Sequence, residues 1–429
     1  CDPRLSDLSR SPVPGPEADM LWHDVPESPP GQPIGSLNGL GCVSNESLVA
    51  CAFGRVPDGW PATPCDQSLA DTVVAYRYDA LNGHPHRVWS SGDLLSCSAL
   101  VSAPMIGQDE SVIAADQSRL VRFDAYGNVQ WTADVAGGIP ISPVITADGM
   151  VVLATFGGPV SAYDSQDGSL LDVLELPSAG GQYHTFNTPA VRGNRVYVIT
   201  SNTANPTEGR LFAIDVNPLR QRGSGEGLVV AWELPVGAPN GASPLVVDDM
   251  IYFDADRLAP GGPLASRVLA VRDEGESGTI VWTAPLAYST KVSFAQDPRG
   301  GLWLFPVGSQ LLLRYAFDDL NDDGIGDLLD AVNVTTLVGG APPALPGSAM
   351  TIGGTPEEPI MLIAANAREE GVVVASYVTA IDLVSRTLRW KVKLPSDFTA
   401  GQFPVLEGGG KPWIVFTSQT EGVWGISEP

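Results

Sequence analysis

Short apolar runs separated by turn residues recur along most of this chain. One complete unit contains four runs, at 142–145, 151–155, 160–164 and 170–176, divided by glycine, aspartate and glutamine residues. Within each run, small and large apolar residues alternate, which is the periodicity of a β-strand. The pattern therefore predicts a repeated unit of four short strands.

The end of the third run carries the most regular signature of the repeat. A small or apolar residue is followed there by aspartate, then by a turn and often by a tryptophan. The instances are 74–89, 120–131, 160–173, 211–232, 268–282 and 377–390. Trp89 and Trp131 lie 42 residues apart, close to the length of a four-stranded propeller blade. We expect the aspartate-to-glycine turns to join the third and fourth strands.

Radial stacking of such sheets buries both faces of each and leaves only short edges. We count eight units, beginning near residues 36, 102, 142, 188, 243, 292, 346 and 402. The last unit has only three runs, and the segment 19–26 resembles the fourth runs of the others. We therefore predict an all-β, eight-bladed β-propeller whose ring is closed by the N-terminal strand beside the C-terminal strands. Seven blades with a separate N-terminal segment is the alternative.

The repeat, small-x-Ala-x-Asp followed by Gly and Trp, resembles the pyrroloquinoline-quinone-type repeat, most closely at Ala380, Asp382 and Trp390. That family includes quinoprotein alcohol dehydrogenases and the propeller lipoprotein of the outer-membrane barrel-assembly machine. The resemblance covers roughly residues 19–427 and implies the fold more specifically than the function. The dehydrogenases resemble one another in an adjacent Cys-Cys disulfide, and this chain has no Cys-Cys pair and no c-type haem motif.

Charge and hydropathy restrict the functional classes. The chain has 24 basic and 49 acidic residues, a formal net charge of −25. Such a surface repels the phosphates of nucleic acids, so we expect no nucleic-acid partner. The sequence contains no apolar run of the length that a membrane-spanning helix needs.

The first residues predict attachment to a membrane. Cys1 begins the sequence, as the acylated cysteine begins mature bacterial lipoproteins, and the following residues are rich in Pro, Ser and Asp. We expect residues 1–18 to form a lipid-anchored tether and 19–429 to form the propeller. The expected location is the bacterial cell envelope, on its periplasmic or extracellular face. An arbitrary boundary of the sequence is the alternative.

The other four cysteines predict disulfides. Their even number fits two bonds in an oxidising compartment, and three pairings are possible. They are Cys42, Cys51, Cys65 and Cys97. We favour Cys51–Cys65, which would staple a long loop of the first blade, and Cys42–Cys97, which would tie the first blade to the second.

The strongest chemical motif spans 319–330 and has the form D-x-N-x-D-G-x-x-D-x-x-D. Calcium prefers about six to eight hard oxygen ligands, and a glycine at the sixth position permits the sharp turn of such loops. The motif resembles dockerin-like calcium loops. The expected ligands are the side chains of Asp319, Asn321, Asp323, Asp327 and Asp330 and the backbone carbonyl of Ile325. We predict Ca²⁺ as the cofactor, stiffening a long hairpin; an acidic turn without metal is the alternative.

Enzymatic motifs are lacking, since the sequence contains no G-x-S-x-G, HExxH or P-loop pattern. We therefore assign no catalytic residues and predict that the chain is not an enzyme. A segment that precedes an inner strand could line the rim of the central channel, and its candidate residues are Gln182, Tyr183, His184 and Asn187. A surface or capping role for them is the alternative.

Two functions from different classes follow. The favoured one is a membrane-anchored, non-catalytic propeller, serving as a scaffold or interaction subunit of a larger cell-envelope or extracellular assembly. Its partners would be the protein subunits of that membrane-associated complex, and the membrane itself through the N-terminal lipid. The alternative is a propeller that binds carbohydrate or another small molecule, or a quinoprotein-like oxidoreductase.

Overall fold

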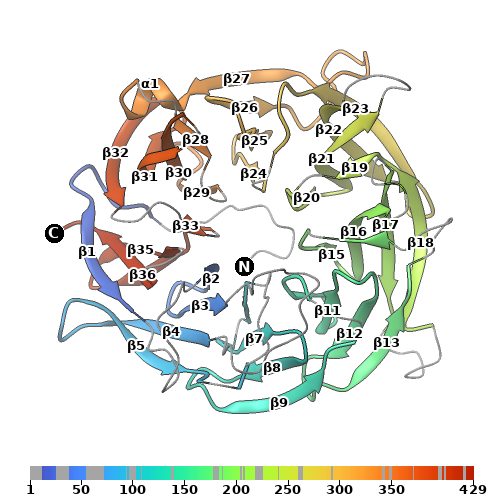
Figure 1. The fold of residues 1–429 in the computed structure, drawn as a ribbon, viewed down its shortest axis with the longest axis horizontal. Helices are drawn as coiled ribbons and strands as arrows, with labels where there is room; N and C mark the ends of the chain where they lie inside the picture. The colour runs from blue at the N-terminus through green and yellow to red at the C-terminus, as the bar shows by residue number, and fades with distance from the viewer. Residues whose placement is uncertain are drawn as a thin grey trace. The chain divides into compact units, whose positions relative to one another are not determined.

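Each repeat folds into one sheet in which strands that follow one another along the chain are neighbours. The computed structural model describes residues 12–25, 38–54, 72–92, 94–95, 103–107, 109–136, 140–176, 183–185, 187–202, 205, 208–217, 226–239, 241–258, 264–290, 293–340, 344–346, 350–370, 372–394, 399–400, 402–418 and 422–429. Their strands form eight sheets of four or five strands each (Figure 1). The fold is an all-β, eight-bladed β-propeller, as predicted.

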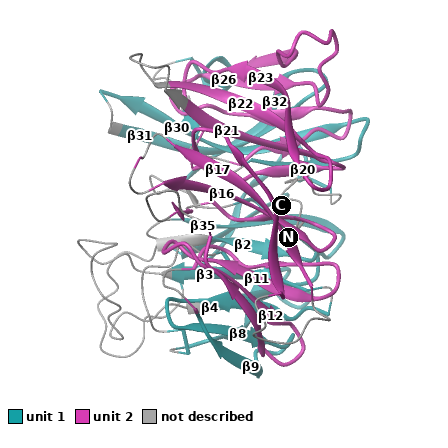
Figure 2. Cartoon of the chain, turned by 90° about the vertical axis from the view of Figure 1, so that its right-hand side faces the viewer, with its two compact units in different colours: residues 1, 8–135, 333–429 teal, residues 2–7, 136–332 magenta. Residues whose placement is uncertain are grey.

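The chain divides into two compact units, coloured separately in Figure 2. Unit 1 comprises residues 1, 8–135 and 333–429, and unit 2 comprises 2–7 and 136–332. Each unit contributes four of the sheets.

Unit 1 holds the first two blades, the last two blades and the short helix of the described chain. The β2–β5 blade consists of β2 (Asn38–Ser44), β3 (Val49–Gly54), β4 (Thr72–Asp79) and β5 (His84–Ser90). The β6–β9 blade consists of β6 (Met105–Ile106), β7 (Val112–Ala115), β8 (Arg119–Phe123) and β9 (Val129–Asp134). The β28–β32 blade consists of β28 (Ala344–Pro346), β29 (Thr351–Gly354), β30 (Pro359–Glu369), β31 (Val372–Asp382) and β32 (Thr387–Leu394), with α1 (Val334–Val338) before it. The closing blade consists of β33 (Thr399–Ala400), β34 (Val405–Gly408), β35 (Lys411–Ser418), β36 (Gly422–Ser427) and β1 (Asp19–Asp24).

Unit 2 holds the four blades that come between these in the sequence. The β10–β13 blade consists of β10 (Val144–Ile145), β11 (Met150–Ala154), β12 (Val160–Asp164) and β13 (Leu170–Leu174). The β14–β18 blade consists of β14 (Tyr183–His184), β15 (Ala190–Arg192), β16 (Arg195–Asn202), β17 (Gly209–Val216) and β18 (Leu228–Pro235). The β19–β23 blade consists of β19 (Ala238–Pro239), β20 (Leu245–Val247), β21 (Met250–Leu258), β22 (Leu264–Asp273) and β23 (Gly278–Pro285). The β24–β27 blade consists of β24 (Ala295–Gln296), β25 (Leu302–Leu304), β26 (Leu311–Tyr315) and β27 (Leu328–Asn333).

The repeat aspartate closes the hairpin between the third and fourth strands. It stands at the end of β4, β12 and β31, and its Oδ1 accepts the amide N–H of the residue two positions on. The N···O distances are 2.9 Å for Asp79 and Leu81, 2.8 Å for Asp164 and Gln166, and 2.9 Å for Asp382 and Val384. A short acceptor side chain at this position makes an Asx turn. The signature in the sequence is therefore a turn signal with a physical function.

Burial follows the position of a strand within its blade. All five residues of β11, Met150–Ala154, are buried, because neighbouring strands and sheets cover both faces. In the outer strand β32 burial alternates instead, and Trp390, Val392 and Leu394 are the buried residues. The core of each unit thus lies between its sheets.

The closing blade joins the two ends of the described chain. β1 pairs antiparallel with β36, and Asp19 lies opposite Ser427 and Asp24 opposite Val423. The predicted closure by an N-terminal strand is confirmed. Within the described ranges, no helix combines the length and apolar character that crossing a bilayer requires.

Candidate functional site

The predicted calcium loop joins β26 to β27. Its first residue, Asp319, folds back over the turn: Oδ2 accepts the amide of Gly324 at 2.6 Å, and Oδ1 accepts the amide of Asp323 at 3.3 Å. Gly324 has a φ of 76°, a left-handed conformation that glycine adopts without strain. The glycine at the sixth position of the motif therefore permits the sharp turn, as the sequence predicts.

Further side-chain oxygens of the motif hold the rest of the turn. Asn321 Oδ1 accepts the amide of Asp323 at 3.0 Å, and Asp323 Oδ1 accepts the amide of Ile325 at 2.8 Å. Asp327 Oδ2 accepts the amide of Leu320 at 2.7 Å, which ties the second half of the loop to the first. The residues at motif positions one, three, five and nine thus share one hydrogen-bonded turn.

The twelfth position lies in β27, the strand paired with β26. Burial lowers the pKa of Arg314 in β26, the charge of Asp297 opposes this, and the charge of Asp330 in β27 opposes it to a smaller extent. Asp330 Oδ1 also accepts the amide of Ala331 at 2.8 Å. Asp330 thus belongs to the strand that follows the turn.

The chemistry of the loop fits a hard cation. Carboxylate, amide and backbone oxygens are the ligands that Ca²⁺ prefers. In the described part of the chain, no group of three or more His, Cys, Asp or Glu side chains converges closely enough to hold a metal. The carboxylates of the loop accept backbone N–H groups instead. Calcium binding stays a prediction, with the residues that would supply the oxygens arranged around one turn.

The loop also forms the docking surface for a tryptophan of the preceding blade. Trp282 in β23 donates its Nε1–H to the carbonyl of Phe317 at 2.9 Å. Gly326 lies against the same indole, where an added Cβ would come within 2.5 Å of the ring. Thr283 exchanges two backbone hydrogen bonds with the loop, of 3.0 Å to the carbonyl of Gly324 and 3.1 Å from the amide of Gly326. The predicted calcium loop is therefore part of a lock between two blades.

The same arrangement occurs elsewhere. Trp89 in β5 donates to the carbonyl of Ala125 at 3.3 Å, and Trp232 in β18 donates to Asp273 Oδ1 at 2.8 Å. In each case the outer-strand tryptophan contacts the hairpin between the third and fourth strands of the next blade. The tryptophan of the repeat therefore locks a blade to its successor.

Asp273 is the centre of a charged network that the sequence did not indicate. Its carboxylate accepts hydrogen bonds from the Tyr197 hydroxyl at 2.6 Å and from Arg195 Nη1 at 2.8 Å. Only 4% of the Asp273 side chain is exposed. Burial alone would raise the pKa of this carboxyl, but hydrogen bonds from Tyr197, the Gly275 amide, Trp232 and Arg195 hold the pKa below its ordinary value. Asp273 is therefore a buried anion whose partners are all structural.

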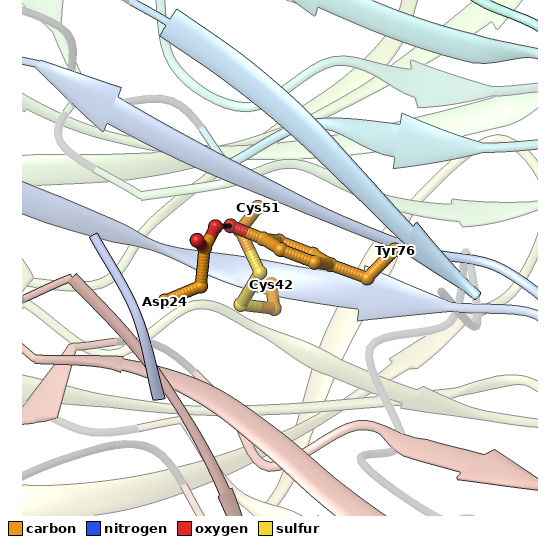
Figure 3. Close-up of a disulfide and its surroundings, with 4 residues drawn as sticks. All are labelled: Asp24, Cys42, Cys51 and Tyr76. Atoms are coloured by element: carbon orange, nitrogen blue, oxygen red, sulfur yellow. Dashed lines mark hydrogen bonds between the residues drawn. A yellow bond between two sulfur atoms is a disulfide. The ribbon is translucent and has the colours of Figure 1, made fainter. Parts of the chain in front are cut away.

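The β2–β5 blade carries a disulfide, and a second charged cluster ties it to β1 of the closing blade. Cys42 and Cys51 lie opposite each other in β2 and β3, with a Cα–Cα distance of 4.0 Å, and are bonded (Figure 3). Nearby, the Tyr76 hydroxyl donates to Asp24 Oδ2 at 2.8 Å, and Arg87 Nη2 donates to the same oxygen at 2.7 Å. Burial, and then the charge of Asp24, raise the pKa of Tyr76 well above its ordinary value. The last residue of β1 is thereby tied to β4 and β5.

The disulfide corrects the predicted pairing. We expected Cys51 to bond Cys65 and Cys42 to bond Cys97, and both pairings are wrong because Cys42 and Cys51 bond each other. The register of β2 against β3 places the two side chains directly opposite, which favours this bond over any longer loop. Cys65 and Cys97 lie outside the described residues, as does Cys1, the predicted lipidation site.

The predicted channel-rim residues have separate environments. Tyr183 is buried and its hydroxyl accepts a hydrogen bond from Arg210 Nε at 2.8 Å, while Asn187 is buried and donates to the carbonyl of Ala242. His184 is half-buried, with its ring centroid 5.1 Å from that of Phe156, and burial lowers its pKa. Gln182 lies outside the described residues. Tyr183 and Asn187 are thus buried and hydrogen-bonded to other residues of the chain, and a ligand role for the rim stays a prediction.

Comparison with known proteins supports the repeat assignment. Residues 94–284 match the model of a family described as "Outer membrane protein assembly factor BamB". No curated protein matches the chain by sequence. The predicted resemblance to propellers with pyrroloquinoline-quinone-type repeats is confirmed.

Two solved structures are similar in fold. BamB from Moraxella catarrhalis is 11% identical with a TM-score of 0.53, and the similarity covers 90% of this chain and 95% of that one. A europium-containing methanol dehydrogenase is 11% identical with a TM-score of 0.61, covering 99% of this chain and 89% of that one. Similarities at this level of identity establish the fold alone.

Proposed function

We propose that this chain is a non-catalytic interaction scaffold of a bacterial cell envelope, and a subunit of a larger protein assembly. The observation that carries the proposal is the match of residues 94–284 to the family described as an outer membrane protein assembly factor. The fold similarity to BamB from Moraxella catarrhalis supports it. A rigid ring of blades presents loops and strand edges on a fixed frame, which suits the binding of protein partners.

The buried charges support a structural rather than a chemical use of the interior. Asp273 and Arg195 join the β14–β18 blade to the β19–β23 blade. Asp297, whose side chain is fully buried, pairs with Arg299 at 2.8 Å and with Arg314 at 2.9 Å. Because these buried groups pair with one another, within a blade or between two blades, partners would bind the exposed loops and edges.

The loop at 319–330 would bind Ca²⁺ and thereby strengthen the lock between two blades. The supporting observation is that the turn of this loop carries the Gly324 carbonyl that Thr283 binds, and that it closely follows Phe317, whose carbonyl Trp282 binds. A cation held by these oxygens would reduce the repulsion among the carboxylates and stiffen the surface against which Trp282 packs. Its role would be stability.

Attachment to a membrane through a lipid on Cys1 is part of the proposal, and a single acyl chain gives only marginal binding. Intact-mass measurement of the protein isolated from its own membranes tests it. A mass increase located at Cys1 by fragmentation is the expected result, and an unmodified Cys1 would remove the anchor from the account.

A quinoprotein-like oxidoreductase is the competing function, favoured by the fold similarity to a methanol dehydrogenase. A turnover assay with added pyrroloquinoline quinone, primary alcohols and a redox dye separates the two. The scaffold proposal expects no dye reduction above that of heat-denatured protein. Catalytic turnover that requires the quinone and saturates with an alcohol would overturn it.

A further inference from the structure

The outer strand β32 presents a line of basic side chains. Arg389, Lys391 and Lys393 are exposed and alternate with buried Trp390, Val392 and Leu394. Side chains two apart on a strand point to the same face, so the three cations form one row. β32 is the last strand of its sheet, as its outer position in Figure 1 shows. We call Arg389, Lys391 and Lys393 the basic row.

The basic row is positively charged, whereas the chain as a whole is negatively charged. The net charge is −25, and only four lysines occur in the sequence, of which Lys391 and Lys393 are two. A fourth cation, exposed Arg386, stands in the turn that precedes β32. Cations are therefore concentrated on one narrow strip of an acidic protein.

Among the described residues, the interactions of the basic row involve one carboxylate, that of Asp382. Lys391 Nζ donates to the backbone carbonyl of Val338 at 2.6 Å and lies 5.3 Å from the centroid of the Tyr377 ring, and neither partner is an anion. The charge of Arg389 helps to lower the pKa of Asp382. Burial opposes this lowering, and backbone hydrogen bonds contribute more to it than Arg389 does. The side chain of Lys393 makes no hydrogen bond or ion pair with any residue that the structure describes. Cations that repel one another along a row are favoured when a bound anion screens them.

We propose that the basic row docks an extended acidic segment of a partner protein. Alternate residues of a strand are about 6.6 Å apart, so an extended chain with carboxylates at every second position matches the spacing of the three cations. The narrow, linear form of the row suits a peptide better than a membrane, and a protein of this net charge is repelled by anionic lipid. This inference rests on the proposed scaffold function. It adds the class of partner that the scaffold would bind, an acidic protein segment.

Fluorescence anisotropy tests the inference with a dye-labelled peptide in which Glu and Thr alternate. A peptide of the same composition with its Glu residues in one block is the spacing control. The variant R389Q/K391Q/K393Q should bind the alternating peptide about tenfold more weakly, as the loss of three exposed ion pairs implies. The control variant R119Q/R192Q/R272Q removes the same charge from scattered exposed positions and should bind within about twofold of the native chain.

Three binding results would overturn the inference: no binding of the alternating peptide to the native chain, equal loss in both variants, or row-dependent binding to phosphatidylglycerol vesicles and not to peptide. Circular dichroism and thermal unfolding would verify that both variants fold. Isolation of the native chain from its envelope separates this inference from the scaffold function. If the same subunits co-purify equally with the R389Q/K391Q/K393Q variant, the docking role of the basic row is refuted and the proposed scaffold function is not.

Discussion

The indole N–H of Trp390 donates to the backbone carbonyl of Pro14 at 2.8 Å, although 376 positions separate the two residues. Val13, Ala18 and Met20 pack against the apolar cluster that contains Trp390. In other blades the outer-strand tryptophan contacts the hairpin of the next blade. At the closing blade the N-terminal segment supplies that surface and then continues into β1.

Substitution of Trp390 by Phe should lower the free energy of unfolding by about 1–2 kcal/mol, because it keeps a ring but removes the donor for the Pro14 carbonyl. Trp424→Phe is the matched control, since Trp424 Nε1 is buried without a hydrogen-bond partner among the described residues and its loss should have a smaller effect. Urea unfolding of the two variants measures the difference. Equal destabilisation would show that the hydrogen bond contributes nothing beyond the size of the ring.

Asp273→Asn should destabilise the protein by about 3 kcal/mol at neutral pH, because it removes a buried anion and leaves Arg195 with Asp215 as its remaining ion-pair partner in the described chain. The folded-state pKa of Asp273 lies below its unfolded value, so its contribution is complete above about pH 4 and is lost as the pH falls through the folded pKa. Unfolding measured from neutral to acidic pH should show the native and variant curves converging at the acidic end. A constant difference across that range contradicts this account of the network.

Replacement of Cys42 and Cys51 together by Ser should cost about 2–3 kcal/mol, from the loop entropy of a short crosslink. Direct evidence comes from digestion after Glu46, which separates the two cysteines in sequence. Without reductant the two peptides should stay joined, and with reductant they should separate. Peptides in which Cys42 is joined to Cys97 would contradict the observed bond. The same map shows whether Cys65 and Cys97 pair with each other.

Calcium should raise the melting temperature of the native chain and change the fluorescence of Trp282, which packs on the loop. Asp319→Asn should abolish both responses, because Asp319 supplies the first ligand of the motif. Asp322→Asn is the control, since Asp322 is exposed, is not a predicted ligand and has a φ of 57° that Asn tolerates. A native chain that responds equally to Mg²⁺ and Ca²⁺, or an Asp319 variant that still responds, refutes the assignment.

The sequence revealed local features of the fold reliably. The repeat aspartate and tryptophan are periodic, so the blades could be counted, and the three-run final unit indicated that segment 19–26 completes it. The Cys42–Cys51 bond was missed because its formation depends on strand register. A signal was available, since the two cysteines lie in consecutive apolar runs joined by a short turn.

Contacts distant in sequence could not be predicted in this way. Nothing near Arg195 indicates that it meets Asp273, because the two residues belong to different repeats and their contact depends on how the blades stack. Likewise, no local pattern shows that Pro14 accepts a hydrogen bond from Trp390. Periodicity predicts elements, and packing then decides which of their polar groups become partners.

The molar mass of the native particle tests the proposed function most directly. The chain, isolated from its own envelope in mild detergent, would be measured by light scattering and its subunits identified and counted by mass spectrometry. The scaffold account predicts a particle much heavier than the 45.0 kDa chain, with other envelope proteins present in fixed ratios to it. A particle with the mass of a single chain and no stoichiometric partner would contradict it.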